Sequence, residues 1–170
     1  MSEMRELFNS QVDTDVEKAA VESELTDPGY YEFQISRVNA MVSDLEMFEN
    51  GDMNPFYKVP VARLNIELFA KAEKANLDFV PLDSKEWFDV KVCPKVVMTK
   101  GRDGKDKLAT PSKLWGQMVK AARKMGATVT IDNDVLDWFI QHRGVIKISK
   151  FEGQDGEPRN FVQAIQAPRE

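Results

Sequence analysis

Cations and flat aromatic rings are the side chains of this sequence whose spacing suggests chemistry. Between residues 91 and 124 there are ten basic residues and only two acidic ones, although the whole chain has a net charge of −5. The ten are Lys91, Lys95, Lys100, Arg102, Lys105, Lys107, Lys113, Lys120, Arg123 and Lys124. A local positive field of this kind attracts an anionic ligand whatever the overall charge.

Trp87, Lys91 and Lys95 are spaced four positions apart. In a β-strand they point to the same face, because alternate residues do so. Residues 100–107 follow with four cations and two glycines, and we predict a flexible basic finger there. Three residues of the last predicted hairpin, Lys147, Phe151 and Arg159, extend this surface.

Binding of a single nucleic-acid strand needs cations that follow the phosphates and rings that stack on unpaired bases. The predicted nucleic-acid-binding residues are therefore Trp87, Lys91, Lys95, Lys100, Arg102, Lys105, Lys107, Lys147, Phe151 and Arg159. A plainer interpretation stays open: Trp87 covers the core, and the lysines protect a strand edge. Phe56 and Tyr57 are interpreted as core and turn residues.

The side chains used most often in catalysis are scarce. His142 and Cys93 are the only histidine and cysteine, so a zinc site with four such ligands is excluded. No glycine-rich phosphate-binding loop is present. We predict no catalytic residue, no metal site, no cofactor and no enzymatic activity, while the 28 acidic residues leave a carboxylate-only Mg²⁺ site open. Cys93 is interpreted as a small core residue.

The N-terminal segment differs in composition from the rest of the chain. Residues 1–28 contain eight acidic and two basic residues, and we predict a mobile arm before a ligand-binding domain at residues 29–170. The arm has no signal-peptide pattern, and no apolar run reaches the ~18–20 residues that a membrane span needs. With a single cysteine, these features predict a cytoplasmic protein without a membrane partner.

Alternating apolar residues predict strands, and punctuation residues predict helices. The expected strands cover residues 29–43, 56–69, 86–99, 144–153 and 157–167, with a bulge near Ala62 in the second. The expected helices cover residues 110–126, with Thr110 as N-cap, and residues 134–142, with Ile140 facing inward. Asp155-Gly156 predicts a hairpin between the last two strands.

This order of three strands, a helix and two strands is that of the OB-fold, a five-stranded Greek-key barrel with a helix between the third and fourth strands. We therefore predict a mainly β barrel of OB type. The competing solution is an open α+β sheet with both helices on one face.

The chain resembles the phage-encoded OB-fold single-stranded DNA-binding proteins over residues 29–167. The resemblance rests on Gly29-Tyr30-Tyr31 at the first strand, on the helix from Ser112 to Gly126, and on the ending FEGQDGEPRNFV at residues 151–162. It implies a bacteriophage protein of DNA replication, recombination or repair whose partners are single-stranded DNA and replication or recombination proteins. Bacterial-type members have an acidic C-terminal tail, whereas the acidic segment here is N-terminal.

Three functions follow as expectations. The first is single-stranded DNA binding, in which the acidic arm competes with DNA for the cationic surface. The second is a protein-interaction or virion structural module of OB type without nucleic-acid binding, because fold alone does not fix function. The third is a carboxylate-metal nuclease. Assembly into homo-oligomers is left open.

Overall fold

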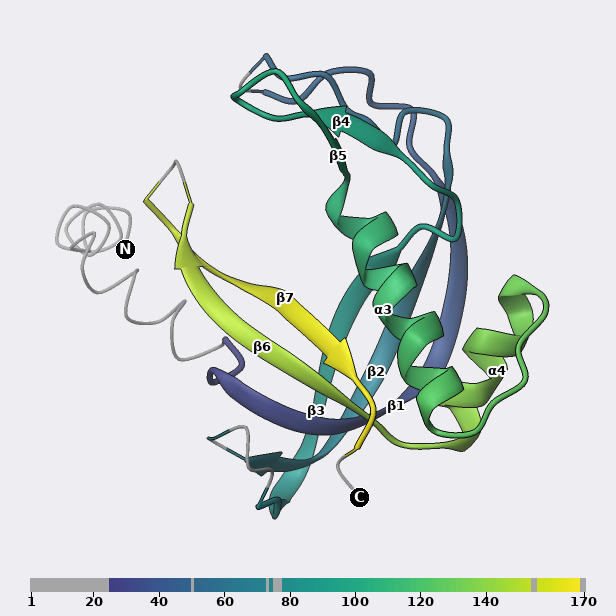
Figure 1. Ribbon diagram of the computed structural model, residues 1–170. Coiled ribbons are helices and arrows are strands. Elements are labelled where there is room, and N and C mark those ends of the chain that lie inside the picture. The colour runs from purple at the N-terminus through teal and green to yellow at the C-terminus, as the bar shows by residue number, and fades with distance from the viewer. Residues whose placement is uncertain (1–24, 50, 73, 75–77, 154–155, 169–170) are drawn as a thin grey trace, which may run out of the picture.

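The curved sheet that organises this protein is shown in Figure 1. The computed structural model describes residues 25–49, 51–72, 74, 78–153 and 156–168 of the 170-residue chain. The predicted acidic arm therefore lies outside the described residues, except for its last four. The sheet contains β1 (Gly29–Val42), β2 (Pro60–Ala72), β3 (Val80–Val92), β6 (Gly144–Glu152) and β7 (Pro158–Gln166) in the order β3-β2-β1-β6-β7, and every neighbouring pair is antiparallel.

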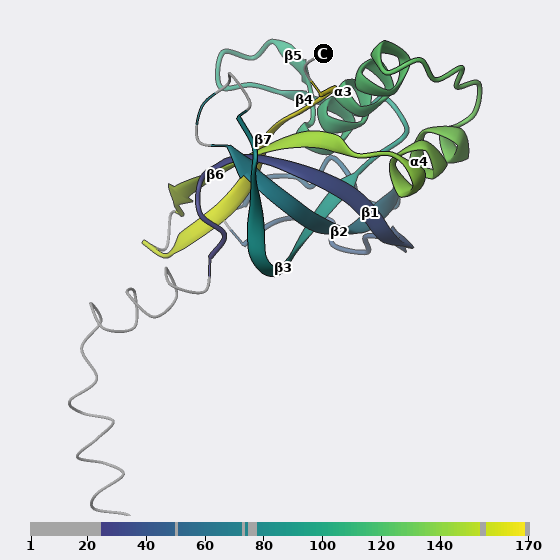
Figure 2. The same ribbon diagram turned by 90° about the horizontal axis from the view of Figure 1, so that it is seen from below.

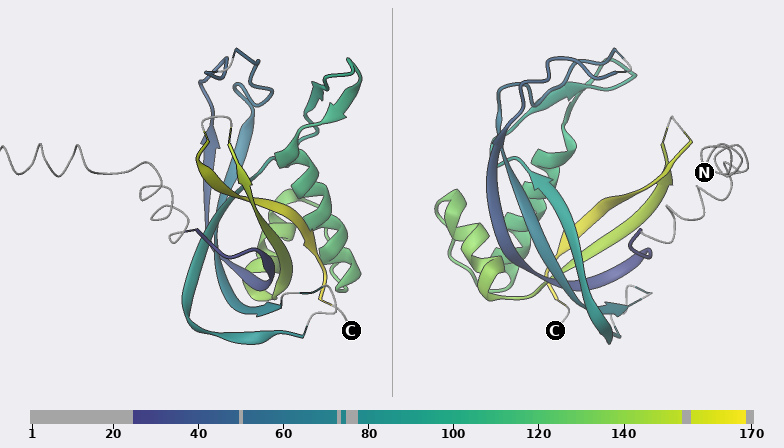
Figure 3. Two further views of the ribbon diagram at one scale, coloured as in Figure 1. Left: turned by 90° about the vertical axis from the view of Figure 1, so that its left-hand side faces the viewer. Right: turned by 180° about the vertical axis from the view of Figure 1, so that it is seen from behind.

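β1 is the strand on which the sheet curls. It pairs with β2 along its whole length but with β6 only through Gly29–Phe33. Register shifts between Glu32 and Phe33 and between Ile35 and Arg37 mark bulges, which increase local twist and let one strand serve two differently oriented partners. The result is a strongly coiled sheet, visible from two sides in Figure 3.

The predicted bulge near Ala62 is wrong. The pairing of β2 runs through Ala62 without a shift, opposite Ala40 on one side and Val92 on the other. The change of phase has another cause: Val61 faces a second, small buried cluster with Cys93, while Leu64 faces the main core. Odd-numbered and even-numbered residues of β2 are therefore both buried, against different clusters, although the strand is regular.

The segment predicted as the third strand, residues 86–99, is divided between two strands, β3 and β4 (Met98–Lys100). β3 ends at Val92, where two consecutive side chains, Val92 and Cys93, are both fully buried and the alternation stops. Residues beyond the turn form a separate hairpin of β4 (Met98–Lys100) and β5 (Asp106–Leu108). At its other end β3 begins at Val80, earlier than expected. Cys93 is a core residue, as predicted.

The helices in the described part of the chain are α3 (Thr110–Lys124) and α4 (Asp132–Gln141), which lie on the same side of the sheet (Figure 2). α3 ends before Gly126, which has φ +105°, as predicted. The N-cap of α3 is Ala109 rather than the predicted Thr110, and the N-cap of α4 is Ile131. The inward position predicted for Ile140 is wrong, since that side chain is exposed.

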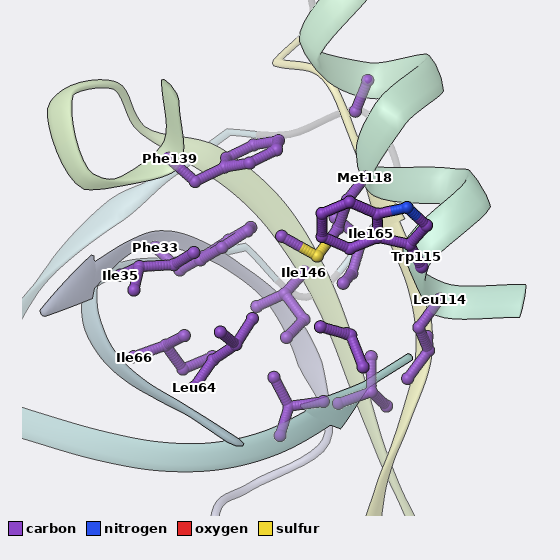
Figure 4. Close-up of a cluster of buried hydrophobic side chains, with 14 of the residues drawn as sticks. Phe33, Ile35, Leu64, Ile66, Leu114, Trp115, Met118, Phe139, Ile146 and Ile165 are labelled. Carbon is purple, nitrogen blue, oxygen red and sulfur yellow. The ribbon is translucent and has the colours of Figure 1, made fainter. Parts of the chain in front are cut away.

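The main core fills the space between the curved sheet and α3. Figure 4 shows side chains from strands and helices meeting there, among them Phe33 and Phe139, whose ring centroids lie 5.5 Å apart. Tyr31 is buried beside them and donates its hydroxyl to the Asp27 carbonyl at 2.6 Å. Burial, with smaller contributions from the nearby Glu86 and Asp27 charges, raises the pKa of Tyr31 well above its usual value.

The predicted closure into a barrel is not found. Among the described residues β3 and β7 do not pair, and α3 packs against both of these edge strands. The backbone N–H of Ile165 in β7 donates to the side chain of Gln117 in α3 at 2.8 Å. The backbone N–H of Cys93, just past β3, donates to the carbonyl of Pro111 at 3.2 Å. Helical groups thus satisfy edge groups that a neighbouring strand would satisfy in a closed barrel.

Candidate nucleic-acid interface

The predicted basic finger is an ordered hairpin. Met98, Thr99 and Lys100 pair with Leu108, Lys107 and Asp106, and Gly104 takes a positive φ of 77° in the turn. The Lys105 N–H donates to the Asp103 side chain at 3.1 Å, so the turn also has its own hydrogen bond. The structure therefore gives the finger a fixed shape rather than that of a flexible loop.

Ser112, in the first turn of α3, binds the segment that leads into this hairpin. Its hydroxyl donates to the Lys95 carbonyl at 2.7 Å and accepts from the Val97 N–H at 3.2 Å. Ser112 is buried, so these bonds are shielded from water. Lys95 consequently lies in the turn after β3. It does not share a strand face with Trp87 and Lys91, and that prediction is wrong.

The loop between β1 and β2, residues 43–59, lies across from the hairpin (Figure 1). Its centre is the buried Asn54, whose side-chain amide donates to the Leu45 carbonyl at 2.7 Å and to Ser43 at 3.1 Å. The Asn54 side-chain oxygen accepts from the Phe56 N–H at 3.0 Å. These bonds hold the loop in shape while Phe48 and Met53 stay exposed.

A cleft of about 1060 Å³ separates this loop from the hairpin and the start of α3. Four cations line it: Lys100, Arg102, Lys107 and Lys113. Its apolar lining comes from Phe48, Met53, Pro55, Phe56, Leu108, Ala109 and Pro111. Among the described residues, no ion pair within 4.0 Å engages any of the four cations. We call this region the hairpin cleft.

Carboxylates lie on both sides of the hairpin cleft. On the loop at residues 43–59, Asp52 is in the lining, and Asp44, Glu46 and Glu49 are exposed outside it. On the hairpin, Asp103 and Asp106 are exposed outside the lining and are outnumbered by the cations. The cations belong to the opposite wall, on the hairpin and α3. The positive potential is therefore concentrated on that wall, and Phe48 and Phe56 face it from the loop.

Trp87 and Lys91 lie together on the solvent face of β2 and β3, away from the lining of the hairpin cleft. The Trp87 indole is 49% exposed, so it does not seal the core. The charges around it are mixed, because Glu67 lies opposite Trp87 and Asp89 lies between Trp87 and Lys91. Alternation along the strand already places Asp89 on this face, whereas only the pairing of β2 with β3 brings Glu67 beside Trp87.

Asp89 stays ionised on this face. It accepts hydrogen bonds from Asn65 at 2.9 Å and from Arg63 at 2.7 Å, and these bonds hold the pKa of Asp89 below its usual value. Arg63 is thereby neutralised. Trp87 and Lys91 thus form a mixed surface rather than a continuous cationic one.

The remaining predicted residues lie on the β6–β7 hairpin and at the tip of the finger. Lys147, Phe151 and Arg159 are on the solvent face of β6 and β7, where the structure adds Phe161 and Tyr30. Lys105 lies at the tip of the β4–β5 hairpin, outside the lining of the cleft. Of the ten predicted residues, the cleft brings together Lys100, Arg102 and Lys107.

Four residues of the cleft were not among the predicted binding residues: Phe48, Met53, Phe56 and Lys113. Phe56, interpreted as a core residue, does pack against the small buried cluster in addition to lining the cleft. Three of the four lie in a loop where polar turn residues alternate with large apolar ones, as in DLEMFENGDMNPF at residues 44–56. A non-strand segment so rich in large apolar side chains is the available signal.

Comparison with protein families, with curated proteins and with solved structures finds no match to this chain. Within the described part of the chain, no group of three or more His, Cys, Asp or Glu is placed to hold a metal ion. No helix in that part is both long and apolar enough to cross a membrane.

Proposed function

We propose that this chain binds single-stranded DNA in the hairpin cleft and serves DNA replication, recombination or repair, in a bacteriophage. The observation that carries the proposal is the meeting of four cations and two phenylalanine rings across one cleft, where no described residue forms an ion pair with these cations. The cations are exposed and Phe48 is 41% exposed, so the fold does not need these side chains. Phe56 is partly buried and also packs against the small buried cluster that contains Val61 and Cys93.

The cations supply affinity for a phosphate backbone. A site that neutralises phosphates releases condensed counterions, and this release favours binding. Lys100 and Lys107 are on opposite strands of the hairpin, Arg102 is in its turn, and Lys113 is on α3. They therefore form a row from the hairpin tip to the helix rather than a single point charge, which suits a chain of phosphates.

The aromatic rings favour a single strand over a duplex. Phe48 and Phe56 offer flat faces to bases, and stacking on a side chain requires a base that is not paired within a helix. Stacking contributes roughly 1–3 kcal/mol per base and tolerates any sequence. The expected preference is therefore for unpaired strands, with little dependence on sequence.

The architecture supports the same proposal. The strand order, with a helix between the third and fourth long strands, is that of an OB-type barrel opened between its third and fifth strands. OB-type proteins bind oligonucleotides on the face of strands two and three and with the loop that joins strands one and two. Residues 43–59 are that loop here, and they form one wall of the hairpin cleft.

One observation favours a second candidate, an OB-type protein-interaction module. Leu45 and Met47 are 55% and 50% exposed on the loop, outside the cleft, and alternate with Asp44 and Glu46. An acidic and apolar strip repels DNA but suits a protein groove with a basic rim. Replication or recombination proteins are partners of this kind.

The test is a mobility shift of the full chain with labelled oligo-dT, with the duplex of equal length, and with both at two salt concentrations. The proposal predicts tight binding to the single strand, weaker binding to the duplex, and loss of affinity as salt rises. Equal binding to both forms would contradict the role of the rings. No binding to either would leave the protein-interaction module as the better description.

A further inference from the structure

The solvent face of β1, β6 and β7 carries a second set of rings and cations, distinct from the hairpin cleft. It consists of Tyr30, Lys147, Phe151, Arg159 and Phe161, which we call the aromatic strip. Phe151 and Phe161 are 45% and 38% exposed, and their rings meet edge to face with centroids 5.4 Å apart.

Strand register places these side chains in one continuous line. Tyr30 lies opposite Lys147, Ser149 opposite Phe161, and Phe151 opposite Arg159. The Lys147 ammonium lies 5.3 Å from the centre of the Tyr30 ring. Alternate residues of a strand are ~6.5–7 Å apart, so rings and cations recur along this line at short, regular intervals.

The charge of this face differs from that around Trp87. The outward positions of β6 and β7 from Lys147 to Phe151 and from Arg159 to Gln163 include no Asp or Glu. Ser149 donates its hydroxyl to Gln163 at 2.8 Å, so the polar groups in the middle are neutral. These positions of β6 and β7 combine exposed rings with two cations, Lys147 and Arg159, a combination that complements bases and phosphates together.

The exposure of the two phenylalanines is itself informative. Complete burial of a phenylalanine side chain contributes about 1.5–3 kcal/mol to folding stability. Because Phe151 and Phe161 stay partly exposed, each contributes less than this to stability. The inner face of the same strands is well filled by Ile146, Ile148 and Val162. The core therefore does not need the outward rings, whereas a stacking surface does.

The hairpins that carry the aromatic strip and one wall of the cleft extend toward the same side of the molecule: the end of the β6–β7 hairpin and the β4–β5 hairpin, with the neighbouring loop, project there together (Figures 1 and 3). We propose that the aromatic strip is a second contact surface for the same DNA strand. Bases stack on Phe151 and Phe161, phosphates approach Lys147 and Arg159, and another part of the strand occupies the cleft.

This inference rests on the proposed function and adds a requirement of length. A strand held at one surface reaches the other as an intramolecular partner, at high effective concentration. Affinity must therefore rise steeply once an oligonucleotide is long enough to contact both surfaces. Shorter oligonucleotides occupy the cleft alone.

The experiment compares the full chain with the double variant Phe151→Ala/Phe161→Ala on oligo-dT of about 5 to 30 nucleotides, a range that brackets the ~4–16 nucleotides bound per OB fold. We expect the variant to lose about 5- to 150-fold in affinity per stacked base on long oligonucleotides, and nothing on the shortest ones that bind. A second variant, Phe151→Leu/Phe161→Leu, keeps apolar side chains but removes the rings, and it is expected to lose affinity in the same way. Thermal melts check that both variants are folded.

The outcomes separate this inference from the proposed function. If the wild-type chain binds and both double variants bind equally well, the role of the aromatic strip is overturned, while binding in the cleft is unaffected. Normal binding by the leucine variant with a loss in the alanine variant shows that packing, not stacking, is involved, and also overturns it. Failure of the wild-type chain to bind any oligonucleotide overturns the proposed function itself.

Discussion

Charge in the hairpin cleft makes a quantitative prediction about salt. The perturbation is the triple substitution Lys100→Gln, Arg102→Gln and Lys107→Gln, which leaves Lys113 as the last cation of the lining. Glutamine keeps a long polar side chain. Because none of the three has an ion-pair partner among the described residues, the fold is expected to tolerate the change.

The magnitude follows from counting cations. For single strands, each neutralised phosphate adds ~0.7 to the negative slope of log affinity against log salt. Four cations in the cleft give a slope of about −2.8, and the one remaining cation gives about −0.7. A fourfold rise in salt, from about 50 to about 200 mM, then weakens the wild type about 50-fold and the triple variant about 3-fold.

The assay is fluorescence anisotropy of a labelled oligo-dT that is short enough to occupy only the cleft, measured across that salt range. The matched control is Lys120→Gln, Arg123→Gln and Lys124→Gln. These residues are exposed near the end of α3 and outside the cleft, and their substitution changes the net charge equally. The control is expected to keep a slope close to that of the wild type.

Two results would refute the reasoning. If the triple variant keeps the steep slope of the wild type, the phosphates are bound elsewhere. If the α3 control loses as much of the slope as the triple variant, net charge rather than the cleft determines binding.

Three further predictions concern a ring, a buried hydroxyl and two glycines. Replacing Phe48 by Ala is expected to cost about 1–3 kcal/mol of DNA-binding free energy. The equally exposed Ile140→Ala on α4 is expected to cost nothing in the same anisotropy assay, and equal losses would contradict stacking. The raised pKa of Tyr31 stabilises the fold fully below the unfolded-state pKa of about 10, and this stability is lost as pH rises above that value. The free energy of urea unfolding should therefore fall more steeply at alkaline pH in the wild type than in Tyr31→Phe. Parallel pH curves for the two proteins would count against burial as the cause. A Cβ at Gly144 would lie 2.6 Å from one core phenyl ring and 2.9 Å from another, so Gly144→Ala is expected to destabilise the fold by about 1–3 kcal/mol. Gly116→Ala, in open space on α3, is expected to stabilise it by about 0.5–1 kcal/mol, and a melting temperature unchanged in both variants would disprove this packing argument.

Local patterns in the sequence predict the elements whose cause is local. The alternation of Tyr31, Phe33 and Ile35 predicts β1, and all three side chains are buried on one face. Gly156, with φ +79°, helps to form the turn between β6 and β7, as the Asp-Gly signal indicates. Gly126 ends α3 for the same kind of reason, since glycine adopts positive φ at low cost.

Barrel closure has no local cause, and sequence reasoning did not resolve it. The β7 edge is satisfied by Gln117, whose partner Ile165 is 48 residues away along the chain. Nothing in the helical pattern of α3 distinguishes Gln117 from an ordinary surface glutamine. The end of β3 was missed for a related reason: Val96 and Met98 continue the parity of the strand after a turn that only Pro94 signals.

One wall of the candidate site, the basic one, was predictable from the sequence. A density of cations in the sequence indicates the basic wall, because charge clusters are visible without a fold. The opposite wall was not visible, since Phe48 and Phe56 lie far before the hairpin in the chain. The bonds of Asn54 shape their loop, and Phe56 packs against the small buried cluster that includes Val97 and Ala109 at the base of the hairpin. Trp87 was favoured because Glu67 of β2 becomes its neighbour only in the folded sheet, and because the cations nearby were weighed without Asp89, which shares the strand face two residues away.

The central claim is that a single DNA strand lies between the β4–β5 hairpin and the loop at residues 43–59. Photo-crosslinking of the full chain to an oligonucleotide with iodouracil in place of thymine tests it most directly, with the linked peptides read by mass spectrometry. We predict crosslinks to Phe48, Met53 or Phe56 on the cleft wall. Crosslinks confined to the face of Trp87, or none at a concentration where the oligonucleotide is bound, would contradict the account.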